Sequence, residues 1–395
     1  MRVVTGLERW LSGEDTAGLA AGARLGLVAH PASVDAQARH AVELVRAASR
    51  FRMLRLFAPE HGLWGREQDM ERVAAARERA SELPVVSLYG ADAASLRPTR
   101  AALADLDAVV VDLQDVGARY YTFVYTLSYV MEAAAEAAIP VIVLDRPNPL
   151  GGELLEGPLL DPRWASFVGR YPLPVRHGMT IGELARYFHR ELGVGAAPRV
   201  VALGGWRRWM RFADTGLPWV PPSPNMPALT TATVYPGGCL IEGTNLSEGR
   251  GTTLPFELVG APWLDGRALA ERLRAEPHPG AAFRAAGFRP MFQKHGGEPC
   301  EGVQVIVREP ARFRPFRCYL ALIREARAQA PQEFDWRREV YEFERERLAI
   351  DLLLGRTELR GMLEAQATTD EMEALWEAEL RAFADRRRSS LLYGP

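Results

Sequence analysis

Lysine is nearly missing from this chain: Lys294 is the one lysine among 48 basic residues in a sequence of 395. All other cations are arginines, and a GC-rich genome is the simplest cause of that bias. The consequence is chemical, because any anionic group of a ligand would have to be held by guanidinium groups, which bind carboxylates through paired hydrogen bonds. The formal net charge is only -2, so charge gives no reason to expect a nucleic acid or a membrane as partner.

Cysteines are also scarce, and the three present are Cys239, Cys300 and Cys318. They form no C-x-x-C pair and are odd in number, which argues against a disulfide framework and favours a reducing compartment or inert buried thiols. No apolar run reaches the ~18 residues of a membrane span, and the first residues lack the apolar segment of a secretory signal. We therefore expect a cytoplasmic protein.

Signature motifs of several protein classes are missing as well. No G-x-G-x-x-G follows the first expected strand and no G-x-x-x-x-G-K-[ST] is present, which argues against nucleotide binding. The G-x-S-x-G of many serine hydrolases is absent too. Histidines, cysteines and carboxylates show no spacing typical of zinc sites. We expect neither a cofactor nor a metal ion.

The chain does contain the apolar residues of a folded protein, since 48% of it is hydrophobic and 25% charged. Its length corresponds to about two domains. Between residues 20 and 145, short β-rich apolar runs alternate with helical stretches, which indicates βαβ units and a mostly parallel sheet. The expected strands cover 25–29, 53–58, 85–88, 108–113 and 141–144, and the expected helices cover 36–50, 99–105 and 121–138. A capping box of Thr180 and Glu183 predicts a further helix at 181–192, before a strand at 200–203.

Five prolines between Pro218 and Pro227 interrupt this alternation. Proline fixes φ and lacks a backbone donor, so this segment forms neither a regular helix nor a central strand. We place the domain boundary here, which gives an α/β domain over 1–227 and a smaller α+β domain over 228–395. In the second domain we expect a strand at 302–307 and helices at 266–275, 318–329, 337–354 and 369–386.

Polar side chains follow each of the first five expected strands. In an open parallel sheet, ligands bind beyond the carboxyl ends of the strands. We therefore predict that Glu60, Gln114, Asp115 and Arg146 line one pocket. The polar residues after any single strand are better explained by a helix cap or a turn. Polar residues after all five strands together favour a site. Carboxylates flanked by arginines and aromatics suit acetal cleavage, in which one carboxyl protonates the leaving oxygen and another stabilises the cationic transition state or activates water.

Eight sequence blocks, in order over nearly the whole chain, carry a family resemblance. They are FAPEHGLWG (57–65), SLYG (87–90), DLQDVGARYYT (112–122), LDRPNPLGG (144–152), EGP (156–158), RHGMTIGELA (176–185), PSPNMP (222–227) and EGTNLSEGRGTTLPFE (242–257). These blocks resemble those of the exo-β-N-acetylmuramidases, a glycoside hydrolase family. The resemblance implies release of N-acetylmuramic acid from the non-reducing end of wall-derived saccharides. It also implies a Rossmann-like N-terminal domain, a smaller C-terminal domain that closes over it, and an active-site cleft between the two.

Three residues are predicted to be catalytic. Glu60 is the expected general acid/base, with Trp64 nearby as an apolar wall that would raise the pKa of its carboxyl. His61 is expected to orient Glu60 or a substrate hydroxyl. Asp115 is the expected second carboxylate, and the alternatives for that role are Asp112 and Glu248. Participation of the substrate's own acetamido group would make a protein nucleophile unnecessary.

Substrate contacts are predicted at residues inside the same blocks. The lactyl carboxylate of the muramic sugar calls for a guanidinium partner, and at least one of four arginines should bind it: Arg119, Arg146, Arg176 and Arg250. The glycine-rich segment 242–251 is the expected contribution of the second domain, because glycine lets backbone approach a ligand closely. The remaining expected contacts are Gln114, Tyr120, Asp145, Asn148, His177, Asn225, Glu242, Asn245 and Glu248.

Two other functions remain open from the sequence. The α/β scaffold could serve a non-catalytic protein that binds muropeptides or sugars, since fold does not determine function. An esterase or amidase acting on the same wall fragments is the second alternative. The sequence does not give the oligomeric state.

Overall fold

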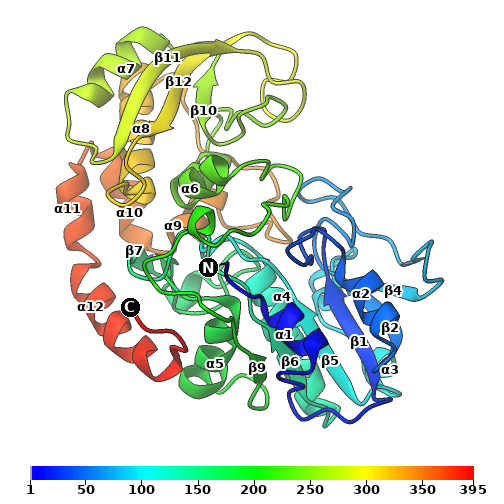
Figure 1. Ribbon diagram of the computed structural model, residues 1–395. Helices are drawn as coiled ribbons and strands as arrows, with labels where there is room; N and C mark the ends of the chain where they lie inside the picture. The colour runs from blue at the N-terminus through cyan, green and yellow to red at the C-terminus, as the bar shows by residue number, and fades with distance from the viewer. Residues whose placement is uncertain (1) are drawn as a thin grey trace.

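A seven-stranded sheet organises the N-terminal half of the computed structural model, which describes residues 2–395 (Figure 1). The strand order is β3-β4-β2-β1-β5-β6-β9, and all neighbours are parallel except β3 and β4. The strands are β1 (Arg24–Ala29), β2 (Arg52–Ala58), β3 (Ala76–Arg77), β4 (Pro84–Ser87), β5 (Ala108–Asp112), β6 (Val141–Leu144) and β9 (Arg199–Val201). The predicted parallel α/β sheet is confirmed.

The core of this sheet follows from its apolar runs. Every residue of β5 and β6 is buried, as expected for parallel strands covered on both faces. The chain steps from β1 to β2 in one direction and from β5 to β6 in the other, so right-handed crossovers place their helices on opposite faces. The helices of these two crossovers are α2 (Ala41–Ala48) and α4 (Phe123–Glu136), and the other helices of this half are α1 (Gly6–Ser12), α3 (Arg100–Leu103) and α5 (Ile181–Leu192).

The predicted capping box at α5 is present. The Thr180 side chain accepts from the Glu183 backbone N–H, while the Glu183 carboxylate accepts from the Thr180 N–H. This fixes the start of α5 at Ile181, directly beside the carboxyl end of β6, which α5 contacts. A two-stranded antiparallel sheet, β7 (Glu156–Leu159) and β8 (Pro174–Arg176), was not expected from the sequence.

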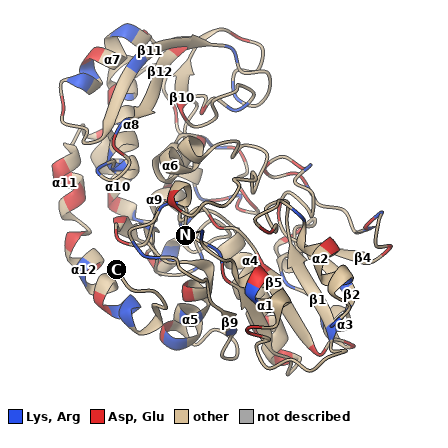
Figure 2. Ribbon diagram, viewed as in Figure 1, with Lys and Arg blue, Asp and Glu red and all other residues tan. Residues whose placement is uncertain are grey.

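The second half of the chain forms a separate three-stranded antiparallel sheet in the order β10-β12-β11. Its strands are β10 (Leu258–Ala261), β11 (Ala281–Phe288) and β12 (Cys300–Val307). Helices of this part are α6 (Leu229–Gly238), α7 (Gly266–Arg274), α8 (Pro315–Gln329), α9 (Ala349–Leu354), α10 (Thr357–Glu364), α11 (Thr369–Ala374) and α12 (Glu377–Arg386). Figure 2 shows both charge signs on α7 and α12, whereas α11 carries acidic residues alone. The expected α/β architecture with a smaller α+β part is therefore confirmed, while the exact boundary at residue 227 stays a prediction.

The C-terminal segment returns to the first sheet. Helices α11 and α12 run from the small sheet back towards α5 (Figure 1), and α12 contacts β7. Arg387 then donates to the carbonyls of His177 and Gly178 at 3.1 and 2.7 Å. The hydroxyl of Tyr393 donates to the Asp145 carboxylate and accepts from the Leu203 N–H. Residues near the end of the sequence thus complete the edge of the N-terminal sheet.

Two of the expected helices are wrong in part. The helix predicted over 337–354 forms only at α9, and the one predicted over 369–386 is broken into α11 and α12. In the first case the backbone turns back between Tyr341 and Glu344, which exchange two hydrogen bonds of 3.1 and 3.0 Å. Tertiary contacts of this turn override the helix-forming tendency of the local sequence.

All three cysteines are buried with free thiols, in agreement with the expectation of inert thiols. Within residues 2–395, none of the helices combines the length and the apolar character that a bilayer crossing requires.

Candidate active site

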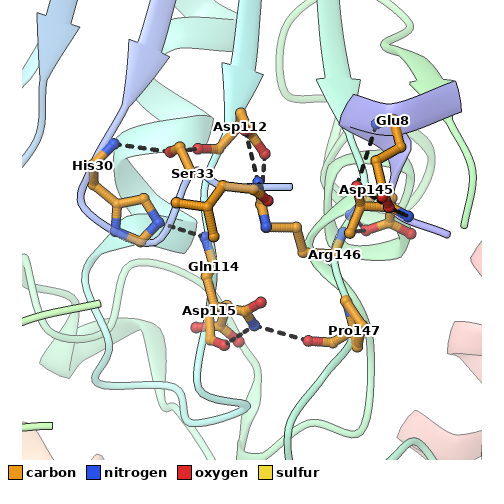
Figure 3. Close-up of polar contacts among 12 residues, drawn as sticks. Glu8, His30, Ser33, Asp112, Gln114, Asp115, Asp145, Arg146 and Pro147 are labelled. Atoms are coloured by element: carbon orange, nitrogen blue, oxygen red, sulfur yellow. Dashed lines mark hydrogen bonds and ion pairs between the residues drawn. The ribbon is translucent and has the colours of Figure 1, made fainter. Parts of the chain in front are cut away.

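The carboxyl ends of β1, β5 and β6 meet in one dense polar network (Figure 3). Arg146 forms a two-pronged ion pair with Asp112, at 2.5 and 2.8 Å, and donates to the carbonyl of Val34. The Gln114 backbone N–H donates to His30 Nε2 at 2.8 Å. These side chains satisfy one another, so they hold the strand ends together and leave little hydrogen-bonding capacity for a ligand.

The prediction that Glu60, Gln114, Asp115 and Arg146 line one pocket is wrong. Gln114 and Arg146 border a narrow void of about 10 Å³ that Glu60 does not reach. Asp115 accepts from the Gly117 N–H at 2.7 Å and lies 3.3 Å from His177 Nε2. Both partners are buried, and neither lines the cavity that contains Glu60.

Glu60 instead opens onto a cavity between the two halves of the chain. Six of the sixteen predicted site residues line it: Glu60, His61, Tyr120, Asn225, Glu242 and Arg250. The other lining residues are Asp69, Tyr121, Thr122, Phe123, Val168, Ser223, Met226, Tyr235, Phe256, Tyr341 and Glu342. The free volume is about 40 Å³, whereas pockets that enclose small molecules usually have ~300–1,000 Å³. The cavity therefore combines many polar groups with very little space.

Glu60 follows β2 directly and is held in place by α4. The hydroxyl of Thr122, immediately before α4, donates to Glu60 Oε2 at 2.6 Å. Glu60 Oε1 receives no such bond from a described residue. His61 next to it has φ +65°, and its Nδ1 lies 3.0 Å from the Glu67 carbonyl. Trp64 was predicted as the wall beside Glu60, but it lies outside this cavity and packs on His40 with 41% of its surface exposed.

Glu342 is a further carboxyl of the cavity, and it was not among the predicted site residues. Burial, together with the negative charge of Glu60, raises the pKa of Glu342 well above its usual range. The Tyr89 hydroxyl donates to Glu342 Oε2 at 2.8 Å, and no cation pairs with Glu342 within the described residues. These surroundings favour the protonated form of the Glu342 carboxyl.

The turn that carries Glu342 has an unusual backbone. Glu342 and Phe343 both have left-handed φ, +47° and +42°, as in the type I′ turns that normally require glycine or asparagine. The ring of Phe343 packs against Tyr89 and Phe167, with ring centroids 5.3 and 5.9 Å apart. Strained residues of this kind persist where surrounding contacts hold them, frequently at functional sites. Here the aromatic contacts keep Glu342 directed into the cavity.

Arg250 also lines this cavity, where carboxylates surround it. Its three guanidinium nitrogens face three carboxylates: Nη2 lies 2.6 Å from Glu242, Nη1 lies 3.0 Å from Asp69, and Nε lies 3.1 Å from Glu248. Glu248 is also paired with Lys294 at 2.8 Å, and does not itself line the cavity. Burial raises the pKa of Glu242, whose Oε2 accepts from the Tyr341 hydroxyl at 2.7 Å.

The other predicted arginines are held inside the fold. Arg119 is fully buried and donates to the carbonyls of Pro158, Leu173, Leu353 and Leu354. Arg176 donates to the carbonyl of Leu150 at 2.7 Å, and burial lowers its pKa to about 10. Only Arg250 among the four reaches the cavity, because the others are consumed by backbone carbonyls or, for Arg146, by Asp112.

Two predicted asparagines also have structural partners. Asn148 bridges the Met179 carbonyl and the Leu150 N–H, both at 2.9 Å. Asn245 binds the backbone of Glu333 and Asp335 and borders a different, more open pocket. His177, which was predicted to contact substrate, is fully buried beside Asp115. The family blocks thus contain both residues that line the cavity and residues that only stabilise the fold, and the sequence does not separate the two kinds.

Asp145, predicted to bind substrate, instead joins three segments at the end of β6. Its carboxylate accepts from the hydroxyls of Tyr393 and Thr180 and from the Gly182 N–H. Burial outweighs these bonds and raises the pKa of Asp145 to about 7. Relative to an unfolded aspartate, the folded state then favours the protonated form.

We expect this shift to make stability depend on pH in a way that Asp145→Asn removes. The contribution of the raised pKa is complete below about pH 4 and is lost as the pH rises towards about 7. Over that interval the wild type should lose more stability than Asp145→Asn, as measured by urea midpoints at several pH values. Asp107→Asn is the control, because the Asp107 carboxyl has a pKa of about 2 and stays ionised throughout. Parallel pH curves for wild type and Asp145→Asn would contradict the assignment.

No group of three or more histidines, cysteines or carboxylates within residues 2–395 is arranged to hold a metal ion. Catalysis without metal or cofactor stays a prediction.

The comparisons with known proteins agree with the two-part fold. Residues 25–230 match the family described as exo-beta-N-acetylmuramidase NamZ, N-terminal, and residues 233–393 match its C-terminal counterpart. The chain is 42% identical over 372 residues to the peptidoglycan beta-N-acetylmuramidase NamZ of Bacillus subtilis, which covers 94% of this chain and 87% of that protein.

Crystal structures of two DUF1343 family proteins from Bacteroides fragilis are also similar. One has a TM-score of 0.88 at 30% identity and covers 99% of both chains. The other has a TM-score of 0.76 at 26% identity and covers 100% of this chain and 99% of its own. The family matches cover both halves of the chain, and the relative from Bacillus subtilis is matched along most of its length. The chain therefore belongs to the NamZ family of exo-β-N-acetylmuramidases.

Proposed function

We propose that this chain hydrolyses the β-glycosidic bond that links a non-reducing-end N-acetylmuramic acid to peptidoglycan-derived saccharides. The observation that carries the proposal is the cavity in which the carboxyls of Glu60 and Glu342 lie with the guanidinium of Arg250. Membership in the NamZ family supports the same substrate class. The cavity lies between the two halves of the chain, where a terminal sugar would contact both.

Glu60 and Glu342 are the proposed catalytic pair. Burial and the negative charge of Glu60 raise the pKa of Glu342 well above its usual range, which favours the protonated form of Glu342. That proton is what the leaving glycosidic oxygen needs when the bond breaks. We assign the donation of that proton to the glycosidic oxygen to Glu60, and the supply of the proton to Glu60 to Glu342. A protonated Glu342 does not fill the role predicted for Asp115, because the second carboxylate stabilises positive charge or activates water.

Arg250 is the proposed partner of the lactyl carboxylate, which distinguishes muramic acid from glucosamine. A guanidinium group holds a carboxylate through two parallel hydrogen bonds, and the cavity offers no other arginine among its lining residues. His61, Tyr120, Asn225 and Glu242 are proposed to contact the sugar itself.

Arg250→Lys is expected to weaken binding of N-acetylmuramic acid by about tenfold or more, with a much smaller effect on N-acetylglucosamine. Lysine keeps the charge but cannot form the two parallel bonds. Calorimetric titration of both sugars measures the difference, with Arg176→Lys as the matched control outside the cavity. Equal losses for both sugars in Arg250→Lys would exclude the lactyl role.

The direct test of the proposed function is incubation with a disaccharide of N-acetylmuramic acid and N-acetylglucosamine. Mass spectrometry should detect free N-acetylmuramic acid released from the non-reducing end. An esterase or amidase would leave the disaccharide linkage intact while altering a substituent or the peptide. A binding protein would retain the saccharide without turnover, so each outcome identifies one of the three functions.

A further inference from the structure

The segment 66–72 between β2 and β3 closes the cavity from the N-terminal side. It contains neither helix nor strand, and two consecutive residues of it bond to distant parts of the chain. Gln68 Oε1 accepts from the Asn225 side chain at 2.8 Å. Asp69 Oδ1 pairs with Arg250 at 3.0 Å and accepts from the Gln293 side chain at 3.1 Å. Each of these bonds crosses from the segment to a distant part of the sequence.

The size of the cavity requires this closure to open. Its free volume of about 40 Å³ is far below the ~300–1,000 Å³ of pockets that enclose small molecules. An acetylated amino sugar with a lactyl group is several times larger. Gly62 and Gly65, with φ of +77° and +63°, lie on the N-terminal side of the segment and suit a hinge. The contacts of Gln68 and Asp69 are therefore the ones that substrate entry must break.

Of the three carboxylates that surround Arg250, Asp69 is the one that can move away from the guanidinium. Glu242 and Glu248 belong to the same stretch of chain as Arg250, and Glu248 is further held by Lys294. Asp69 comes instead from the segment that closes the cavity, and its bond to Arg250 Nη1 points at the position assigned above to the lactyl group. Replacing one carboxylate by another leaves the charge of this buried cluster unchanged, so the exchange avoids the large penalty of an uncompensated charge.

We propose that segment 66–72 is a lid and that Asp69 is a stand-in for the substrate carboxylate, holding Arg250 in place until the lactyl group displaces it. This inference rests on the proposed function, because it takes muramic acid as the ligand. Asp69 then contributes to specificity: a sugar without a carboxylate cannot compensate Arg250 when the lid opens, whereas muramic acid can. The closed lid also keeps the guanidinium ordered before the sugar arrives, which lowers the entropic cost of binding.

The test compares Asp69→Asn with Glu71→Gln by calorimetric titration with N-acetylmuramic acid and with N-acetylglucosamine. Asp69→Asn removes the competing carboxylate, so N-acetylmuramic acid should bind several-fold more tightly, while N-acetylglucosamine should gain much less. Glu71→Gln removes the same charge from the same lid, but Glu71 bonds only within the lid, at the Gln68 N–H. It should bind both sugars as the wild type does.

Unchanged or weaker binding of N-acetylmuramic acid by Asp69→Asn would overturn the stand-in role. An equal gain in affinity for N-acetylmuramic acid in both variants would show that net charge alone causes the effect, and would also overturn the stand-in role. Failure of the wild type to release N-acetylmuramic acid from the disaccharide would instead count against the proposed function. The two inferences can therefore fail separately.

Discussion

Replacing Glu60 by glutamine should lower the release of N-acetylmuramic acid by about 10²–10⁴-fold, the usual contribution of a general acid/base. The glutamine side chain preserves volume and can still accept the bond from the Thr122 hydroxyl, but it cannot transfer a proton. Melting temperature and sugar affinity should change little, because Glu60 faces the cavity and carries little apolar packing. Steady-state rates on the disaccharide, with calorimetry for binding, measure the two effects.

A nitrophenyl glycoside should restore part of the lost activity in Glu60→Gln, since a good leaving group needs less protonation. Glu132→Gln is the control: this carboxylate lies on α4, pairs with Arg170 at 2.9 Å and lies outside the cavity. Its variant should retain the wild-type rate. Wild-type rates for Glu60→Gln on the natural disaccharide would show that Glu60 is only a structural cap, and would leave Glu342 as the carboxyl to test.

Arg119→Met is expected to destabilise the protein by roughly 3–5 kcal/mol, the range seen when buried polar networks lose one partner. Arg119 lies with its guanidinium among four backbone carbonyls from β7, the segment before β8, and α9. Without it these carbonyls lose one donor, although Leu173 keeps the Leu160 N–H, and each unsatisfied buried group costs about 1–3 kcal/mol. Arg119 thus joins the N-terminal half to α9 rather than binding a ligand.

Urea midpoints and apparent melting temperatures measure this effect, with Arg381→Met as the control. Arg381 lies on α12 with 67% of its side chain exposed and pairs only with Glu377, so its loss should change stability by less than about 0.5 kcal/mol. If Arg119→Met folds too poorly to study, Arg119→Lys keeps a donor and should show a smaller loss. Wild-type stability of Arg119→Met combined with weaker sugar binding would return Arg119 to the list of ligand contacts.

Local signals in the sequence were sufficient for most of the first sheet. Apolar runs such as those of β5 and β6 have few alternatives to a buried parallel strand. The box of Thr180 and Glu183 likewise located the start of α5, because its hydrogen bonds span only three residues. In both cases the information needed is contained within a short window of the chain.

The cavity depends on information that no short window contains. Asp69 and Glu342 are missing from the predicted site although both line it. Glu342 lies in a stretch with strong helix formers, but the contacts of Phe343 with Tyr89 and Phe167, residues distant in sequence, help hold it in a turn. Conversely, Gln114 and Arg146 follow predicted strands as expected, but their side chains are bonded to other strand ends. Gln114 donates to the Pro147 carbonyl and Arg146 donates to Asp112. Whether a polar strand end faces a ligand or another loop is decided by packing between distant segments.

The bond between Tyr393 and Asp145 has a consequence for how the protein is made. Asp145 is buried after β6, yet one of the four donors to its carboxylate comes from a residue almost 250 positions later. Domains tend to fold in order as they leave the ribosome, but this sheet edge can reach its final form only after residue 393 has been synthesised. During translation the Asp145 carboxylate therefore lacks the hydrogen bond from Tyr393 until the last residues emerge. Completion of the first domain and docking of the last helices become one event rather than two.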